Sequence, residues 1–200
     1  MAVLIHTLLH GSEGRAEQLV EESTYKSRDG RKLLETRLWT ESTWAAGRYD
    51  IVLKEGETVR YRRIIPPEKE ARYVKVSWAP TSDAALVAVN YKAGEDWILI
   101  RLAKGKAVSD SFFDGDTLLM AQMFEELPFH DEIKNSAPVG RVPWNELKWL
   151  KHRRCTMPFI FRGIGYEGTA NLLIDYRLAK PAFSVVSIVP GVDQSLWDQN

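Results

Sequence analysis

The densest group of residues that could do chemistry lies near position 150, where cations alternate with aromatic rings. Its members are Trp144, Lys148, Trp149, Lys151, His152, Arg153 and Arg154. Cations interleaved with indole rings can hold a nucleic-acid strand or an anionic glycan through charge and stacking. The same pattern is typical of a solvated face whose tryptophans point into the core, and we favour this second interpretation. As a binding site, the cluster is the best candidate in the sequence.

Two clusters of carboxylates raise the question of a metal site. Asp110, Asp114 and Asp116 lie close together, but their spacing misses the D-x-D-x-D-G calcium loop and its distal Glu. The run His130-Asp131-Glu132 offers ligands on adjacent residues, which rarely bind one metal, and H-E-x-x-H is absent. We therefore expect no metal ligands, no cofactor and no recognisable catalytic residues.

Two further features have simple structural interpretations. Residues 163–168 satisfy G-x-G-x-x-G, but the next residues alternate as a strand, so we predict a hairpin connection rather than a dinucleotide site. Cys155 is the only cysteine, and a nucleophilic thiol would need His and Asn or Asp nearby. Only His152 is close in sequence. We expect Cys155 to be a small, semi-buried residue at the start of a strand.

Composition limits the classes of partner. Lys plus Arg and Asp plus Glu both number 27, so the basic excess of a general nucleic-acid binder is missing. No stretch approaches the roughly 18 apolar residues of a membrane span. The apolar fraction of 44% is ordinary for a globular protein. We expect residues 1–200 to form a single domain. Its expected partner is a protein or a carbohydrate. Composition does not determine its oligomeric state.

Patterns of period two dominate the chain and predict antiparallel hairpins. Residues 19–28 and 32–40 flank Asp29-Gly30, one of the strongest hairpin turn signals. Residues 47–54 and 58–65 flank a second short turn that contains glycine. A meander and a final group of strands follow, over residues 73–78, 85–91, 97–102, 158–162, 170–178 and 182–189.

Helical signals are few. Residues 117–127 place Leu and Met on one stripe behind a capping Asp, which predicts the main helix, and residues 144–152 could add a shorter one. Residues 128–143, with three prolines, are expected to form a long loop. Residues 1–18 are expected to be either a flexible lead-in or a first strand. The class is therefore mainly β, or a β-dominated α+β fold.

Residues 76–106 resemble a bacterial β-propeller repeat, in which a strand ending in Trp leads through a Pro- and Asp-containing turn to apolar strands. Trp78, Pro80 and Asp83 carry the resemblance, and echoes occur at residues 38–53 and 147–178. It implies blade-like meanders. Because a closed propeller would need nearly the whole chain, we expect an open or incomplete propeller-like arrangement, with a β-sandwich as the alternative. The resemblance also favours a periplasmic or secreted location over the cytoplasm.

The leading hypothesis is a non-enzymatic binding module for a protein or a glycan-like ligand. The alternative is a hydrolase with dispersed carboxylates and His130 or His152. Trp78 and Trp97 are expected to share one packed cluster in the meander, as structure rather than as a binding platform. The strand that begins at Trp97 is apolar on both faces, which predicts that it is covered on both sides.

Overall fold

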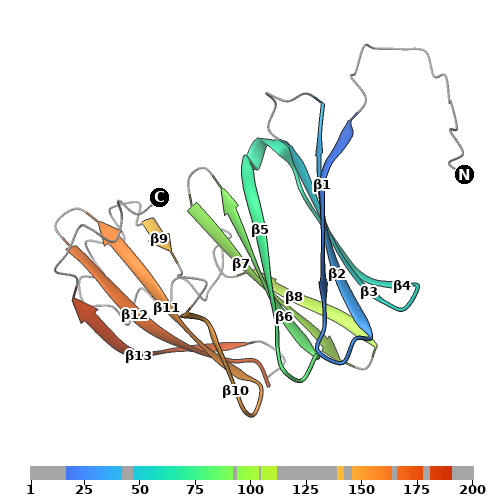
Figure 1. The fold of residues 1–200 in the computed structure, drawn as a ribbon. Coiled ribbons are helices and arrows are strands. Elements are labelled where there is room, and N and C mark those ends of the chain that lie inside the picture. Colours follow the sequence, from blue (N-terminus) through green and yellow to red (C-terminus); the bar gives the residue numbers. More distant parts are fainter. Residues whose placement is uncertain are drawn as a thin grey trace, which may run out of the picture.

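Strands account for most of the residues that the computed structural model describes, which are 17–41, 47–91, 94–103, 105–111, 139–141, 146–163, 166–177 and 181–190 (Figure 1). Among these residues, backbone hydrogen bonding between neighbouring segments defines thirteen strands. Their bounds are β1 Gln18–Lys26, β2 Lys32–Thr40, β3 Arg48–Glu55, β4 Thr58–Ile65, β5 Ala71–Trp78, β6 Ala84–Tyr91, β7 Gly94–Ala103, β8 Lys106–Ser111, β9 Val139–Arg141, β10 Lys148–Leu150, β11 Arg154–Gly163, β12 Tyr166–Asp175 and β13 Ala182–Pro190.

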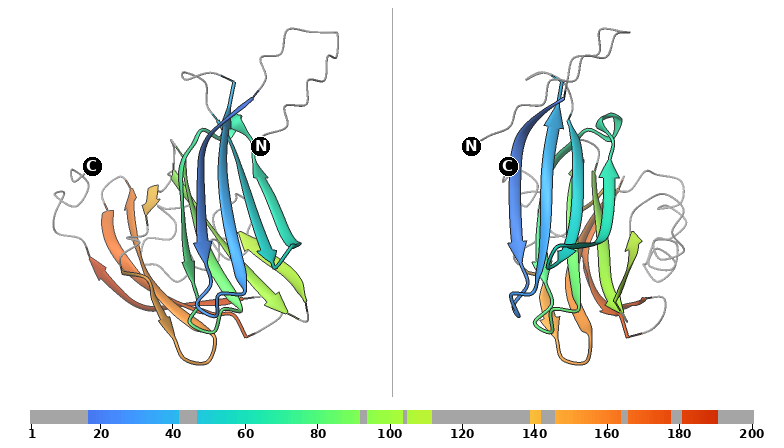
Figure 2. Two further views of the ribbon diagram at one scale, coloured as in Figure 1. Left: turned by 45° about the vertical axis from the view of Figure 1, so that its right-hand side comes forward. Right: turned by 90° about the vertical axis from the view of Figure 1, so that its right-hand side faces the viewer.

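The described strands form three antiparallel sheets in chain order. The first sheet is β1–β4 and the second is β5–β8; the third is β10–β13, with β9 also pairing with β11. Consecutive strands pair within each sheet, so the expected meanders are confirmed. Figures 1 and 2 show the sheets side by side in an open row. None closes into a barrel, and the row has three layers rather than the two of a sandwich.

Local turn chemistry explains the hairpins that the sequence predicts. Gly30 has φ +71°, a conformation that suits glycine, between β1 and β2. The Ser27 hydroxyl donates to Asp29 at 2.6 Å and accepts from the Lys32 amide at 3.0 Å. The predicted G-x-G-x-x-G hairpin is also confirmed, because β11 and β12 pair antiparallel with Gly163 opposite Tyr166.

The second sheet is buried on both faces. On β6, Ala85, Val87 and Val89 point toward the first sheet and pack in one hydrophobic cluster with residues such as Ile51 and Leu53. The alternate residues of β6 point toward the third sheet and pack in a second cluster that includes Phe159 and Leu172. The prediction that the strand after Trp97 is covered on both sides is confirmed, since Trp97, Ile98, Leu99 and Ile100 are all buried.

Trp78 and Trp97 do not share a cluster, so that prediction is wrong. Trp97 is opposite Ala88 and packs toward the third sheet, where it is fully buried. Trp78 is opposite Ala85 and packs, half-buried, toward the first sheet. Directly paired residues point to the same face of a sheet, and the pairing register puts these two indoles on opposite faces. Both still contact the core, as the structural interpretation requires.

Two predictions around the third sheet need correction. Val139–Arg141, inside the expected loop 128–143, forms β9 and pairs with residues 160–162 of β11. Lys148–Leu150, inside the possible helix 144–152, forms β10, with Trp149 opposite Cys155. In both places an unpaired edge of β11 gains backbone hydrogen bonds, which outweigh the weak local preference for loop or helix.

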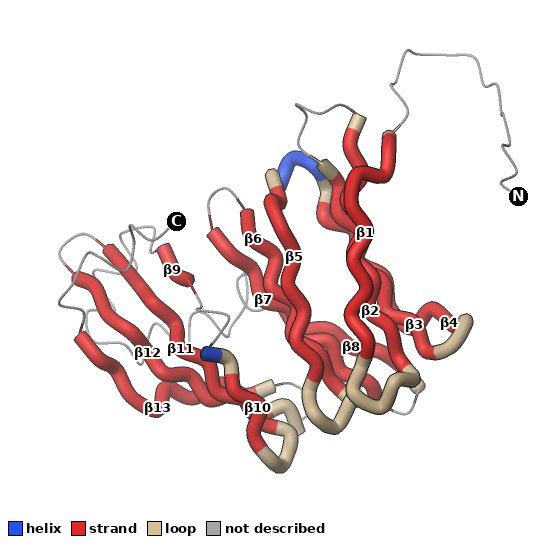
Figure 3. The backbone as a smooth tube through the Cα atoms, in the orientation of Figure 1, coloured by secondary structure: helices blue, strands red, loops and turns tan. Residues whose placement is uncertain are grey.

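Helical structure is minor among the described residues, as Figure 3 shows. The helix η1, Pro67–Lys69, connects the first sheet to the second and is a single 3-10 turn. Within the described part of the chain, no helix combines the length and hydropathy needed to cross a membrane. The predicted helix over 117–127 lies outside the described residues, as do residues 1–16 of the expected lead-in.

Candidate functional site

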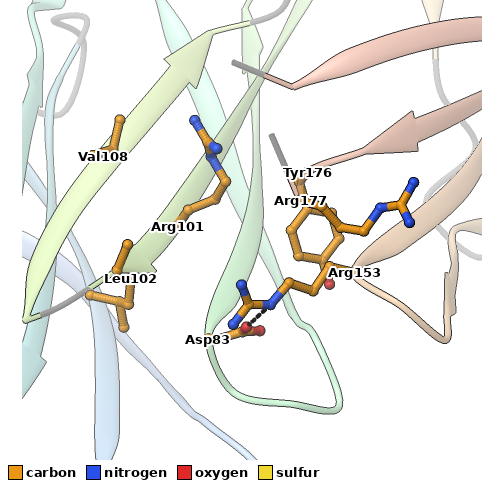
Figure 4. Close-up of a pocket in the computed structure, with 8 residues that line it drawn as sticks. Asp83, Arg101, Leu102, Val108, Arg153, Tyr176 and Arg177 are labelled. Carbon is orange, nitrogen blue, oxygen red and sulfur yellow. Dashed lines mark ion pairs between the residues drawn. The ribbon is translucent and has the colours of Figure 1, made fainter. Parts of the chain in front are cut away.

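A cleft of about 290 Å³ opens where one end of the second sheet meets the third sheet. The residues that line it come from four places in the chain: the β5–β6 turn, strands β7 and β8, the β10–β11 turn, and the segment after β12 (Figure 4). They are Asp83, Arg101, Leu102, Ala103, Val108, Arg153, Tyr176 and Arg177. Three of these are arginines and one is an acid. We call this the arginine cleft.

Arg153 joins the two sheets at the mouth of the arginine cleft. Its Nε lies 2.7 Å from Oδ2 of Asp83, which belongs to the β5–β6 turn of the second sheet, as Figure 4 shows. His152 and Arg153 both have left-handed backbone conformations, φ +59° and +55°, which reverse the chain tightly between β10 and β11. The Arg153 carbonyl accepts a hydrogen bond from the Tyr176 amide at 3.1 Å. The turn that carries Arg153 is therefore fixed to the end of β12.

The other two arginines each have a carboxylate partner beside the cleft. Arg101 Nη2 donates to Asp110 Oδ2 at 2.7 Å. Arg177 Nε donates to both oxygens of Asp175, at 2.9 and 3.0 Å, and these hydrogen bonds lower the pKa of the Asp175 carboxyl. The side chains of Arg153 and Arg177 are 56% and 57% exposed. Their guanidinium groups are thus held in place and still reach solvent.

Tyr176 forms the inner wall of the arginine cleft. It is buried in the cluster between the second and third sheets, and burial raises the pKa of its phenol to about 12. Its ring meets the Trp149 ring edge-on, with centroids 5.8 Å apart. The phenol stays protonated at neutral pH. The wall is therefore neutral, and the charge of the cleft comes from its arginines and Asp83.

The structure spreads the predicted basic and aromatic cluster over two environments. Lys148, Lys151, His152 and Arg153 are exposed, whereas Trp149 and Arg154 are half-buried. Trp149 packs against the core, and its Nε1 donates to Ser77 Oγ in the second sheet at 2.8 Å. Of the described members, only Arg153 lines the arginine cleft. Trp144 lies outside the described residues.

Sequence reasoning did not identify four of the cleft residues as site residues: Asp83, Arg101, Tyr176 and Arg177. Each stands alone in sequence, within or just beyond a strand or turn, with no neighbouring residues that form a functional motif. The signal that could have found them is positional. In a meander, alternate turns lie at the same end of the sheet. Charged residues near these turns therefore become neighbours when the sheets stack.

Within the part of the chain that the structure describes, the other candidate catalytic and metal residues do not assemble into a site. Cys155 is fully buried, and burial raises the pKa of its thiol to about 12, while His152 is exposed on the β10–β11 turn. His130, Asp114 and Asp116 lie outside the described residues, and Asp110 is the partner of Arg101. Within the described ranges, no three His, Cys, Asp or Glu side chains come close enough to hold a metal ion.

A second cleft, of about 350 Å³, lies beside η1 at one end of the first sheet. Its lining residues are Glu17, Trp39, Thr40, Glu41, Arg48, Pro67, Glu68 and Glu70. Arg48 lies 3.0 Å from Glu17 and stacks over the Trp39 ring, with the guanidinium carbon 5.6 Å from the ring centroid. Four carboxylates thus face one guanidinium in this acidic cleft, the reverse of the arginine cleft.

Comparisons with protein-family models, with curated proteins and with solved structures find no match to this chain. The resemblance of residues 76–106 to a β-propeller repeat therefore stays a prediction. Any functional assignment depends on the geometry of the two clefts.

Proposed function

We propose that this protein is a non-enzymatic binding module that captures an acidic segment of a partner protein in the arginine cleft. The observation that carries the proposal is the convergence of Arg101, Arg153 and Arg177 on one cleft from separate parts of the chain. A guanidinium group binds carboxylates through paired, charge-assisted hydrogen bonds. Two of the three arginines are more than half exposed, so an incoming carboxylate can reach them and compete with their partners, Asp83 and Asp175.

A protein partner fits the surface better than a glycan does. Glycan sites present aromatic rings on which sugars stack, but Tyr176 is only 5% exposed. Trp149 is half-buried with its indole N–H engaged by Ser77. The cleft wall instead offers short aliphatic groups from Leu102, Ala103 and Val108. Such a wall accepts the methylene groups of Glu or Asp side chains, which carry the charge that the arginines bind.

Binding also fits these residues better than catalysis does. Hydrolysis needs a base or nucleophile within hydrogen-bond reach of the substrate. The Asp83 carboxylate, the one acid of the cleft lining, is already paired with Arg153 at 2.7 Å. The hydrolase alternative, which depends on His130 or His152, gains no supporting contact from the described residues. We further propose that the three meanders are blade-like scaffolds of β-propeller type, which each sheet's simple up-and-down order supports.

A peptide titration tests the proposed function. A fluorescein-labelled polyglutamate peptide should bind the protein in about 20 mM NaCl and dissociate in about 500 mM NaCl, because salt screens exposed charges. Arg153→Gln combined with Arg177→Gln should weaken binding about tenfold, measured by fluorescence anisotropy. Arg62→Gln is the matched control, since its side chain is 57% exposed and also ion-paired, on the outer face of the first sheet.

Two polyanions of other chemical classes test whether the partner is a protein. Single-stranded DNA and polygalacturonate are titrated under the same conditions as the peptide. If either binds more tightly than polyglutamate and loses affinity in the Arg153 and Arg177 variant, the partner is not a protein. Equal weakening by Arg62→Gln would mean that the overall charge, and not the arginine cleft, controls binding.

A further inference from the structure

Charge is divided between the two ends of this molecule. The strands run up and down, so the turns gather at a cleft end and at an η1 end (Figure 1). At the cleft end, residues 26–32 carry four cations and one acid, Asp29. Other acids at this end are Glu55 and Glu57 of the β3–β4 hairpin, together with Asp83 and Asp175, which pair with Arg153 and Arg177.

The β5–β6 turn links the two basic turns of the cleft end. The Asp29 amide donates to Ser82 Oγ at 3.0 Å, which joins the β1–β2 turn to the β5–β6 turn. Asp83, in the same β5–β6 turn, pairs with Arg153 of the β10–β11 turn. The cations of residues 26–32 and the arginines of the cleft therefore lie at the same end of the molecule, where cations outnumber acids.

The η1 end presents the opposite charge. Among the described residues that line the acidic cleft, Glu17, Glu41, Glu68 and Glu70 face one cation, Arg48. Pro67, Glu68, Lys69 and Glu70 are all exposed on the connection between the first and second sheets. The chain as a whole carries no net charge, so two copies meet without long-range repulsion.

We propose that the acidic η1 end of one copy docks on the basic cleft end of a second copy, so that the protein self-associates head to tail. This inference rests on the proposed function and names its partner: the acidic segment is the η1 end of the same chain. Opposite charges at opposite ends give one favourable orientation, because like ends repel. A head-to-tail contact leaves a free end on every copy, so association continues beyond a dimer unless the ring closes.

Sedimentation velocity in low and high salt is the first test. In about 20 mM NaCl the sedimentation coefficient should rise with protein concentration and pass the value of a dimer, and in about 500 mM NaCl the protein should sediment as a monomer. Sedimentation as a monomer at every concentration in low salt would overturn the proposal. So would a dimer that survives high salt, since its interface would not be electrostatic.

Charge reversal tests which surfaces meet. Glu41→Lys with Glu68→Lys makes both ends basic, and Arg153→Glu with Arg177→Glu makes both ends acidic, so each variant alone should sediment as a monomer. An equimolar mixture of the two should associate again in low salt. Lys75→Glu, a reversal at an exposed site in the middle of β5, is the control and should associate like the wild type. A mixture that stays monomeric would contradict the head-to-tail contact.

Failure to fold is separated from failure to associate. Circular dichroism of each variant is recorded first. Any charge reversal that loses the strand signal is replaced by the Glu→Gln or Arg→Gln substitution at the same positions. These neutral variants should reduce association at least fivefold. The polyglutamate titration distinguishes the two proposals. If wild-type protein binds the peptide but does not self-associate, the head-to-tail inference fails alone; if it does neither, the arginine cleft is not a binding site.

Discussion

The second sheet has two interfaces, and they are built differently. Toward the first sheet, its aliphatic residues meet Ile51 and Leu53, with Tyr49 and several partly buried aromatic rings around them. Toward the third sheet, small residues such as Ala84 and Ala88 leave space that Trp97 and Phe159 fill. The largest fully buried side chains at the first interface are therefore Leu and Ile, whereas those at the second include the rings of Trp97 and Phe159.

Polar contacts cross both interfaces among the described residues, and side chains meet at each: Arg63 Nη2 of the first sheet lies 3.6 Å from Asp96 Oδ2 of the second. At the first interface, Tyr25 and Tyr49 donate to the carbonyls of Val74 and Arg72 at 3.3 and 3.1 Å, and Trp78 donates to the Tyr25 carbonyl at 3.0 Å. At the second interface, two contacts join side chain to side chain: Trp149 to Ser77, and Arg153 to Asp83. The arginine cleft lies at the second of these interfaces.

Removing the largest side chain of the second interface should have the largest effect. Trp97→Ala deletes a fully buried indole, and we expect it to lower the free energy of unfolding by about 4 kcal/mol through lost contacts and a cavity. Urea unfolding followed by circular dichroism measures the change. Trp78→Ala at the first interface is the comparison; because Trp78 is half-buried, we expect about 2 kcal/mol. Equal losses would contradict the contrast between the two interfaces.

The tryptophans also show how far sequence reasoning extends in this chain. Period-two alternation and turn residues predicted the hairpins, because both are local properties. The faces occupied by Trp78 and Trp97 depend on the register between β5, β6 and β7, which pairs them with Ala85 and Ala88 respectively. Register follows from packing of whole strands, so a residue count across two turns does not determine it.

The arginine cleft is predictable from the sequence only in part. Arg153 belongs to a local cluster of cations, which marks it as a candidate. Arg101 and Arg177 are isolated in sequence and come together only when the second and third sheets stack. The cations that flank Trp149 in the sequence suggest a surface on which a ligand could stack. Its hydrogen-bond partner, Ser77, lies 72 positions away in the sequence and turns the indole inward. Long-range partners of this kind leave no local pattern.

High pH should weaken both interfaces through their tyrosines. Burial raises the pKa of Tyr49 and of Tyr176 from 10.0 to about 12, one at each interface. Between these values the unfolded chain loses the phenolic proton while the folded chain keeps it. Stability is therefore full below about pH 10 and falls toward pH 12, by about 2 kcal/mol for each tyrosine. Urea midpoints across this range measure the fall.

Phenylalanine variants show how much of the stability lost at high pH comes from the tyrosine at each interface. Tyr49→Phe and Tyr176→Phe remove the titrating groups, so each should flatten the dependence of the urea midpoint on pH by about half. If only Tyr49→Phe did so, water would reach Tyr176 through the arginine cleft. An unchanged slope in both variants would show that other groups cause the alkaline loss.

The hydrogen bond from Trp149 should contribute less to the free energy of unfolding than the titration of either tyrosine does. Trp149→Phe keeps an aromatic ring against the core but removes the donor to Ser77 Oγ, and we expect a loss of about 1 kcal/mol in the free energy of unfolding. Ser77→Ala and the double variant complete a thermodynamic cycle. A coupling free energy near zero would mean that the bond does not help to hold the third sheet to the second.

The Arg153–Asp83 ion pair should contribute least to stability, and its loss should strengthen binding. Arg153 is 56% exposed, so solvent screens the pair, and Asp83→Asn should cost only about 0.5 kcal/mol in the free energy of unfolding. The same substitution removes the one acid that competes with a ligand for Arg153 in the cleft lining. Polyglutamate should therefore bind about threefold more tightly to Asp83→Asn than to the wild type, since the guanidinium is then open to the peptide. Tighter binding with nearly unchanged stability would separate the two roles of this interface. Weaker binding would mean that Asp83 positions Arg153 for the ligand and that the pair acts as one unit.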